Sequence, residues 1–295
     1  MTWLTGNGYL LMMVTAIAWS GNAIVARGAH ELIPPVGLAF WRWSATLPIL
    51  LLLAWPHLKR DIPEALRNWR IMLFLSVLSV SIYNSLIYIA LNSTTATNSF
   101  LINTSRPAII VLMSLMFFRI PFTPVQAFGL AFGLLGTVII VLRGDLAVLA
   151  TLDFNPGDIW VVVATICWAL YTVFLHKRPK VHPASFMVMT VFFGLPILFP
   201  FYLWESLTLR TVPIVPETFG AVAYLAVVAT VIAYLSYNRA VELLGANRAG
   251  LTSYLLPVFG VTLAILLLDE QLQIFHLVGI TLLLGGTWLA TRGKT

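Results

Sequence analysis

Charged side chains are scarce in this sequence. Asp, Glu, Lys and Arg make up only 9% of its 295 residues, whereas hydrophobic residues make up 60%. A soluble domain carries about 25% charged residues, because its surface must interact with water. A soluble protein of this size could not hide so much apolar surface. The composition therefore excludes a soluble globular protein and predicts an integral membrane protein.

Cysteine is also nearly absent, and recognisable cofactor motifs are missing. The single cysteine, Cys167, excludes an intrachain disulfide, and its apolar surroundings indicate a small buried hydrophobe. The five histidines lack the spacing of metal ligands, and no glycine-rich loop carries the Lys and Ser or Thr that bind nucleotide phosphates. We expect no metal, no cofactor and no ATP-driven step.

Two further function classes lack their sequence features. The net charge is +6, but the basic residues are scattered between apolar runs and form no patch for a phosphate backbone. The apolar runs contain no nucleophile with a matching base, as an intramembrane enzyme would need. We therefore expect neither a nucleic-acid partner nor an enzyme.

What the sequence does contain is a series of long apolar segments. A membrane-spanning helix needs roughly 20 mostly apolar residues. Ten such segments occur, and they cover about 7–27, 35–55, 70–91, 96–118, 123–142, 157–176, 183–204, 217–240, 247–268 and 274–291. The breaks between them hold Pro, Gly, Asn and charged residues, and none of the breaks is long enough for a soluble domain. The predicted fold is an all-α integral membrane protein with ten transmembrane helices.

The distribution of Lys and Arg predicts the orientation. With the N-terminus inside, twelve Lys and Arg residues fall in the inner loops and three, Arg27, Arg143 and Arg210, fall in the outer loops. Basic residues concentrate on the cytoplasmic side of membrane proteins. Both termini are therefore predicted to be cytoplasmic. A miscount by one helix would destroy this bias, so it also supports the number ten.

The second half of the sequence resembles the first half at an offset of 148 to 150 residues. Matching positions include Trp19 and Trp168, Pro48 and Pro196, Pro107 and Pro257, and Gly136 and Gly286. We predict a five-helix repeat in residues 1–145 and a second in 155–295. Because five is odd, the second repeat is inverted relative to the first. Inverted repeats are typical of secondary transporters with a solute site between the halves, although a channel or scaffold is an alternative.

Several short motifs carry a family resemblance. They are Ala18-Trp19-Ser20-Gly21-Asn22, Phe40-Trp41-Arg42-Trp43, Ala233-Tyr234-Leu235-Ser236-Tyr237-Asn238, Leu256-Pro257-Val258, and Asp269-Glu270 followed by Gly279 and Gly285-Gly286. With these motifs the chain resembles the EamA-like branch of the drug/metabolite transporter superfamily over nearly its whole length. Arg119-Ile120 departs from the pattern, because an acidic turn would be expected at that point of the first half.

The resemblance implies a multi-pass transporter of the bacterial inner membrane that exports small metabolites by alternating access. Within the branch the chain looks most like the YddG-type amino-acid exporters, which implies apolar or aromatic amino acids as substrates. Its partners would be a small-molecule substrate and the lipid bilayer. A monomer is expected, with a homodimer as the alternative.

Arg106 is the most prominent candidate site residue. It lies about ten residues into its predicted span, too deep for its side chain to reach the membrane surface readily. Asn103 lies one helical turn earlier on the same face. The guanidinium is suited to bind a substrate carboxylate. The alternative is a structural role, in which Arg106 binds carbonyl groups that Pro107 leaves without a partner.

Aromatic and amide side chains are the other candidates for substrate binding. They are Trp19, Asn22, Tyr83, Tyr88, Trp168, Tyr234, Tyr237 and Tyr254. Together they would form an aromatic wall with a few hydrogen-bonding groups. Trp and Tyr also form belts at the membrane surface, which is the alternative for Tyr88, Tyr171 and Trp204. Trp19 and Trp168 lie midway along their spans, so a cavity position is favoured for both.

Three further residues are predicted to have structural or gating roles. Arg42 lies near the end of its span, and Pro107 and Pro257 each remove a backbone hydrogen bond from a predicted helix. No carboxylate lies deep in a span, which favours facilitated diffusion or exchange over proton coupling. It also makes the second functional hypothesis, an exporter of organic cations or drugs, weaker than amino-acid export.

Overall fold

The computed structural model describes residues 6–29, 31–90, 93–94, 99, 102–145, 147, 156–268 and 273–292. The acidic turn at Asp269 and Glu270 lies outside these residues. Seven segments within them are long and apolar enough to cross a membrane: Pro35–Arg67, Trp69–Ala90, Pro124–Val141, Pro156–Lys177, Pro183–Thr208, Pro216–Leu244 and Ile274–Thr291. Further helices, α2 (Gly8–Ala29), α7 (Arg106–Phe118), α13 (Ala246–Gly250) and α14 (Thr252–Leu268), lie in the three other predicted segments.

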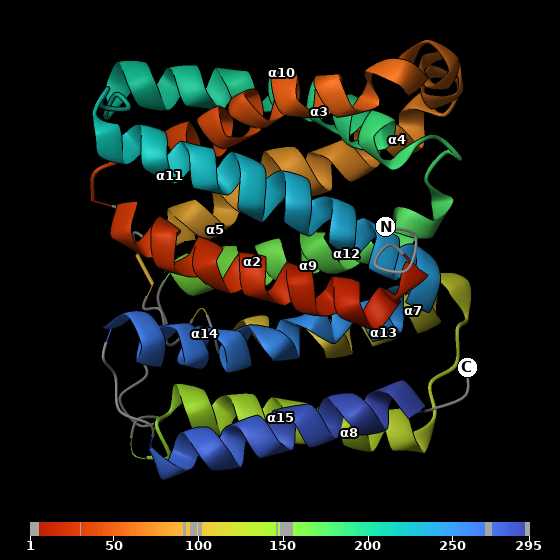
Figure 1. The fold of residues 1–295 in the computed structure, drawn as a ribbon, viewed down its shortest axis with the longest axis vertical. Coiled ribbons are helices and arrows are strands. Elements are labelled where there is room, and N and C mark those ends of the chain that lie inside the picture. The colour runs from red at the N-terminus through yellow and green to blue at the C-terminus, as the bar shows by residue number, and fades with distance from the viewer. Residues whose placement is uncertain are drawn as a thin grey trace.

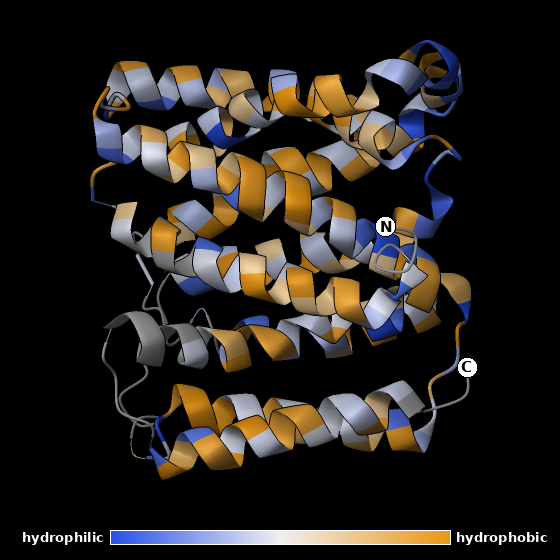
Figure 2. Ribbon diagram, viewed as in Figure 1, coloured by the Kyte–Doolittle hydropathy of each residue, from blue (hydrophilic) through white to orange (hydrophobic). Residues whose placement is uncertain are grey.

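The helices lie side by side in one bundle, as Figure 1 shows. The pair α3 (Pro35–Arg67) and α10 (Pro183–Thr208) forms one edge, and the pair α8 (Pro124–Val141) and α15 (Ile274–Arg292) forms the opposite edge. Helices α2 and α9 (Pro156–Phe174) lie near the middle of the bundle. Hydrophobic residues cover the length of the helices, and hydrophilic residues gather at the helix ends (Figure 2). This distribution fits a lipid-facing exterior.

Two of the spanning segments change helix type at corresponding points. The segment Trp69–Ala90 consists of α4 (Trp69–Ser76), the π-helical stretch η1 (Val77–Tyr83) and α5 (Asn84–Ala90). The segment Pro216–Leu244 consists of α11 (Pro216–Ala226), the π-helical stretch η4 (Val227–Ile232) and α12 (Ala233–Leu244). The two π-helical stretches begin 150 residues apart, which is the offset of the sequence repeat. A π-helix shifts the hydrogen-bond ladder and often marks a functional site.

Helix α3 is longer than the sequence predicts. The prediction ended the span near residue 55 because Pro56, His57 and charged residues follow it, but the helix continues to Arg67. Lys, Arg and Glu are good helix formers, so they end the apolar stretch without ending the helix. Asn68 alone separates α3 from α4.

The mid-helix position predicted for Pro107 is wrong. Thr104 and Ser105 form a turn, and α7 begins after it at Arg106. Pro107 is the second residue of this helix, where a backbone N–H has no helical partner to lose. Pro257, by contrast, lies inside α14. The two prolines therefore do not form a matched pair of mid-helix hinges.

Carboxylates join α3 and α10 at both ends of the pair. Glu205 of α10 accepts hydrogen bonds from the backbone N–H groups of Val36 (3.1 Å) and Gly37 (2.6 Å) at the start of α3. Asp61 of α3 accepts one from the backbone N–H of His182 (2.9 Å), the residue that caps α10. Both acids are buried. A carboxylate stabilises a helix N-terminus through its unpaired N–H groups and its dipole.

His182 makes this junction sensitive to pH. Its ring stacks on that of His57 with 4.0 Å between centroids, and its Nδ1 accepts the Ala184 N–H at 3.3 Å. Burial, followed by repulsion from His57 and Arg60, lowers the pKa of His182, and Asp61 opposes the shift only in part. The folded protein therefore binds a proton at His182 less readily than the unfolded chain does.

We expect acidification to destabilise the protein through His182. Stability is lost as the pH falls below about 6.5, the ordinary histidine value, because the unfolded chain then takes up more protons. Melting temperatures in detergent at pH 7.5 and 5.5 test this. The variant His182→Asn keeps a capping side chain and should lose less stability over the same interval. An equal loss in both proteins would contradict the assignment to His182.

Glycines hold α8 against α15. A Cβ at Gly286 would lie 2.5 Å from the backbone nitrogen of Gly133 and 2.6 Å from the carbonyl oxygen of Gly129. A Cβ at Gly136 would lie 2.6 Å from the carbonyl oxygen of Gly279. The two backbones are thus in direct contact, as small residues allow in membrane helices. The GxxxG spacing of Gly129 and Gly133 serves packing within the chain.

Candidate functional site

Six aromatic side chains meet at the middle of the bundle, and we call them the aromatic cluster. They come from α2, η1, α9 and α12, and they are Trp19, Tyr83, Trp168, Tyr171, Tyr234 and Tyr237. Trp168 contacts all of the others, with ring centroids 4.7 to 5.5 Å away. Such edge-on and tilted contacts are the preferred aromatic geometries. The two tryptophans that the repeat pairs, Trp19 and Trp168, are direct neighbours at 5.1 Å.

Hydrogen bonds fix several members of the cluster. Trp19 Nε1 donates to the carbonyl oxygen of Ala229 (3.1 Å), in the π-helical stretch η4. Tyr171 OH donates to Asn238 Oδ1 at 2.8 Å, and the hydroxyls of Tyr237 and Thr172 are 2.8 Å apart. Tyr171, like Trp168, is fully buried. This position excludes the membrane-surface belt for Tyr171.

Arg42 lies beside the aromatic cluster with its hydrogen bonds satisfied. Its Nε donates to Thr230 Oγ1 (2.7 Å) and a terminal nitrogen donates to the Ala229 carbonyl (3.0 Å). Its other terminal nitrogen donates to Asn84 Oδ1 (3.0 Å) and Tyr88 OH (2.9 Å). The guanidinium therefore joins α3 to α5 and η4. Because each of its three nitrogens already donates a hydrogen bond, its geometry is that of a structural group.

Arg106 lies beside the cluster on Tyr83 and Trp168, and its hydrogen bonds are not satisfied. Its guanidinium carbon is 5.4 Å from the Tyr83 ring centroid and 5.9 Å from that of Trp168. One terminal nitrogen donates to Tyr83 OH (2.9 Å) and to Asn103 Oδ1. The buried Nε has no hydrogen-bond partner among the described residues. Arg106 is only 5% exposed.

The charges of both arginines lack a carboxylate partner within the part of the chain that the structure describes. An unpaired buried charge is costly, so a protein retains one where it has a use. For Arg42, four hydrogen bonds to neutral groups offset part of the cost of burying the charge. For Arg106 an N–H remains free to bind a further acceptor.

The side-chain oxygen of Asn22 is a buried hydrogen-bond acceptor that complements the free donor of Arg106. It lies on α2 one turn from Trp19, and its Oδ1 is buried without a partner among the described residues. This oxygen accepts hydrogen bonds, whereas the free N–H of Arg106 donates one. The vicinity of the aromatic cluster thus offers a cationic donor and a neutral acceptor.

The structure brings most of the predicted substrate-binding residues together, but not all of them. Trp19, Tyr83, Trp168, Tyr234 and Tyr237 belong to the aromatic cluster, and Asn103 and Arg106 lie against it. Tyr88 is buried and bonds to Arg42, so it lies with the structural network and not in a surface belt. Tyr254 lies elsewhere: its OH donates to the Leu130 carbonyl (2.9 Å), and its ring covers Gly133 of α8.

Sequence reasoning did not predict the hydrogen bonds by which amide and hydroxyl groups orient these side chains. Asn84 Nδ2 donates to Tyr234 OH at 3.2 Å, and these two residues occupy matching positions of the repeat. The 150-residue offset was the signal that could have paired them. The π-helical carbonyl of Ala229 had no such signal, because hydrophobic patterning does not show a local change of helix type.

The comparisons with known proteins agree on one family. The sequence pattern of the EamA-like transporter family matches this chain twice, over residues 6–142 and 155–292. An uncharacterized transporter of Archaeoglobus fulgidus is 29% identical over 98% of this chain and 98% of its own length. The uncharacterized transporter YyaM of Bacillus subtilis is 24% identical over 97% of this chain and 93% of its own.

A solved structure shares the fold. It superposes with a TM-score of 0.78 and covers 96% of both chains, at 18% sequence identity. The two matches to the family pattern together span nearly the whole chain. This chain therefore belongs to the EamA-like family of the drug/metabolite transporter superfamily, and it is a membrane transporter rather than an enzyme.

Proposed function

We propose that the protein exports amino acids, in particular apolar and aromatic ones. The observation that carries this proposal is the buried guanidinium of Arg106, whose Nε lacks a partner among the described residues and which lies against Tyr83 and Trp168. A guanidinium binds a carboxylate through parallel hydrogen bonds. Asn22 Oδ1 would accept from the ammonium group, and the aromatic cluster would contact the side chain. A solute with all three features is an amino acid.

The proposed mechanism is alternating access between two inverted five-helix repeats, residues 1–145 and 155–295. The matched π-helical stretches and the double match to the family pattern support the repeat. The first helix begins and the last helix ends on the same side of the bundle (right in Figure 1), which supports an even number of spans. The bias of Lys and Arg supports a cytoplasmic position for that side, in a bacterial inner membrane. A monomer suffices, because α15 already occupies the glycine face of α8.

The proposal includes the energetics of transport. The polar side chains that contact the aromatic cluster within the described chain are arginine, asparagine, threonine and tyrosine. None of these side chains is a carboxylate or a histidine, the groups that carry protons in many pumps and transporters. We therefore propose facilitated diffusion or exchange, driven by the gradient of the amino acid itself.

Counterflow into proteoliposomes tests the function. Vesicles loaded with unlabelled phenylalanine should accumulate labelled phenylalanine transiently and saturably, and they should do so equally with and without a pH gradient. Leucine should compete at a lower concentration than benzyltrimethylammonium, an organic cation without a carboxylate. Competition by the cation alone would favour drug export. A current that does not saturate would favour a channel.

A further inference from the structure

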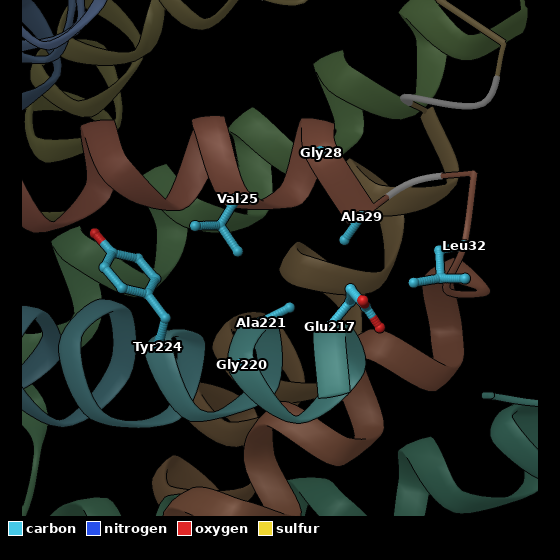
Figure 3. A pocket seen from close by; sticks show the side chains of 8 residues that line it. All are labelled: Val25, Gly28, Ala29, Leu32, Glu217, Gly220, Ala221 and Tyr224. Carbon is cyan, nitrogen blue, oxygen red and sulfur yellow. The ribbon is translucent and has the colours of Figure 1, made fainter. Parts of the chain in front are cut away.

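A pocket lies apart from the aromatic cluster, between α2 and α11. Its volume is about 320 Å³, and its lining includes Val25, Gly28, Leu32, Glu217, Gly220 and Tyr224 (Figure 3). It is near the end of α2 and the beginning of α11, which the proposed orientation places on the outer side. Most of the lining is apolar, and Glu217 contributes the carboxylate. We call this pocket the outer groove.

Tyr224 forms the inner end of the outer groove. Its OH donates to the Ala18 carbonyl at 3.2 Å, and a Cβ at Gly21 would overlap this hydroxyl. The residue next to Ala18 is Trp19, a member of the aromatic cluster. Tyr224 therefore links the groove, through one long hydrogen bond, to the backbone next to Trp19.

The corresponding place at the other end of the bundle is filled. Phe74 matches Tyr224 at an offset of 150 residues, and Phe174 matches Val25 at an offset of 149. The rings of Phe74 and Phe174 are in contact, with centroids 5.2 Å apart. Phe117 and Phe118 pack on the same Phe174 ring at 5.2 and 5.1 Å. Of two equivalent helix contacts, one contains a pocket and the other contains four packed rings.

The pocket at one helix contact and the packed rings at the other indicate that the two repeats differ in conformation. Two similar halves in different conformations expose a solute site to one side and close it from the other. The outer groove is then the open end of the path, and the phenylalanine contact is its closed cytoplasmic end.

We propose that the outer groove is a second solute-binding site on the export path, selective for small molecules that carry an ammonium group on an apolar body. This proposal rests on the proposed transport function. Val25, Leu32 and the Tyr224 ring would contact the apolar body, and Glu217 at the rim would bind the ammonium. Glu217 is exposed, and it forms no ion pair with a residue that the structure describes.

Cysteine labelling tests the site directly. Gly220→Cys and Gly28→Cys each place a reporter on one wall, and a Cβ at either position meets no atom within 4 Å. The background carries Cys167→Ser, which removes the single native cysteine. A membrane-impermeant maleimide added to spheroplasts should label both reporters. Phenethylamine should slow the labelling at least about fivefold, whereas 3-phenylpropionate, which has no amine, should not slow it.

Glu217→Gln should raise the phenethylamine concentration needed for protection by about threefold to tenfold, a modest effect because the carboxylate is exposed and screened. Leu209→Cys is the control, because Leu209 is exposed at the same end of the bundle. Its labelling rate should be the same with and without phenethylamine. Arg70→Cys, which corresponds to Gly220 in the repeat, should stay unlabelled from outside. Each variant is compared only after it elutes as a single species in detergent.

The outcomes separate the two proposals. Unslowed labelling, or protection that persists unchanged in Glu217→Gln, overturns the outer groove as an amine site. If phenethylamine protects the groove but phenylalanine shows no counterflow, the amino-acid proposal fails and the groove stands. If counterflow succeeds without any protection, the groove proposal fails by itself.

Discussion

Replacing Arg106 with glutamine should weaken the binding of amino acids about tenfold to a hundredfold. A charge-assisted hydrogen bond contributes about 1.5–3 kcal/mol, and each 1.4 kcal/mol is a factor of ten in affinity. Glutamine keeps polar atoms near Asn103 and Tyr83 but removes the charge and the fork of donors. The half-saturation concentration for phenylalanine counterflow measures the loss. The affinity of phenethylamine, an analogue without the carboxylate, should stay within about twofold when both proteins also carry Glu217→Gln, which weakens amine binding in the outer groove.

Two variants separate recognition of the carboxylate from loss of structure. Arg106→Lys keeps the charge without the planar fork, so it should recover part of the affinity. Tyr254→Phe removes a buried hydroxyl that bonds to the Leu130 carbonyl and not to the aromatic cluster, and it should leave the half-saturation concentration unchanged. If Arg106→Gln weakened phenylalanine and phenethylamine equally, Arg106 would support the site rather than bind the carboxylate.

Replacing Gly286 with valine should destabilise the protein by about 3 kcal/mol, at the upper end of the usual range for an overpacked site. The added carbons would meet the backbone of Gly129 and Gly133, which cannot rotate away as a side chain can. Helices α8 and α15 would have to separate along their shared face. Loss of the monodisperse peak after heating in detergent gives the apparent melting temperature, which should fall by several degrees.

The neighbouring residue provides the matched control. A Cβ at Gly285 meets no atom within 4 Å, so Gly285→Val adds the same carbons to the same helix without the contact. Its melting temperature should stay close to that of the unchanged protein. Equal losses in both variants would mean that valine in α15, and not the closeness of α8, causes the effect.

The sequence predicted the membrane class and the helical segments well, because these depend on the length and hydrophobicity of local runs. It matched Trp19 with Trp168 in the repeat, but it did not predict that their rings are in contact. It did not predict the continuation of α3 to Arg67, since polar residues end an apolar run without ending a helix. It also placed Pro107 inside a helix, because the prediction followed the apolar run and did not take Thr104 and Ser105, residues common at helix starts, as a break.

The sites were harder to predict than the spans. The sequence distinguished Arg42 from Arg106 only by their depth in the predicted spans. Their difference depends on partners that come from distant segments, such as Thr230 for Arg42. Tyr254 was predicted to bind substrate with the other aromatic residues, but the direction of its side chain depends on how α14 packs on α8. The role of Glu205 needed the structure too, because its partners are backbone groups of another helix.

The reciprocal carboxylate caps limit how α3 and α10 can move. Sliding one helix along the other would pull Glu205 from Val36 and Gly37, and Asp61 from His182, leaving charges without their donors. Tilting both helices together leaves every one of these bonds intact. During a transport cycle α3 and α10 should therefore move together as one rigid unit. The conformational changes should occur in the helices between the two outer pairs.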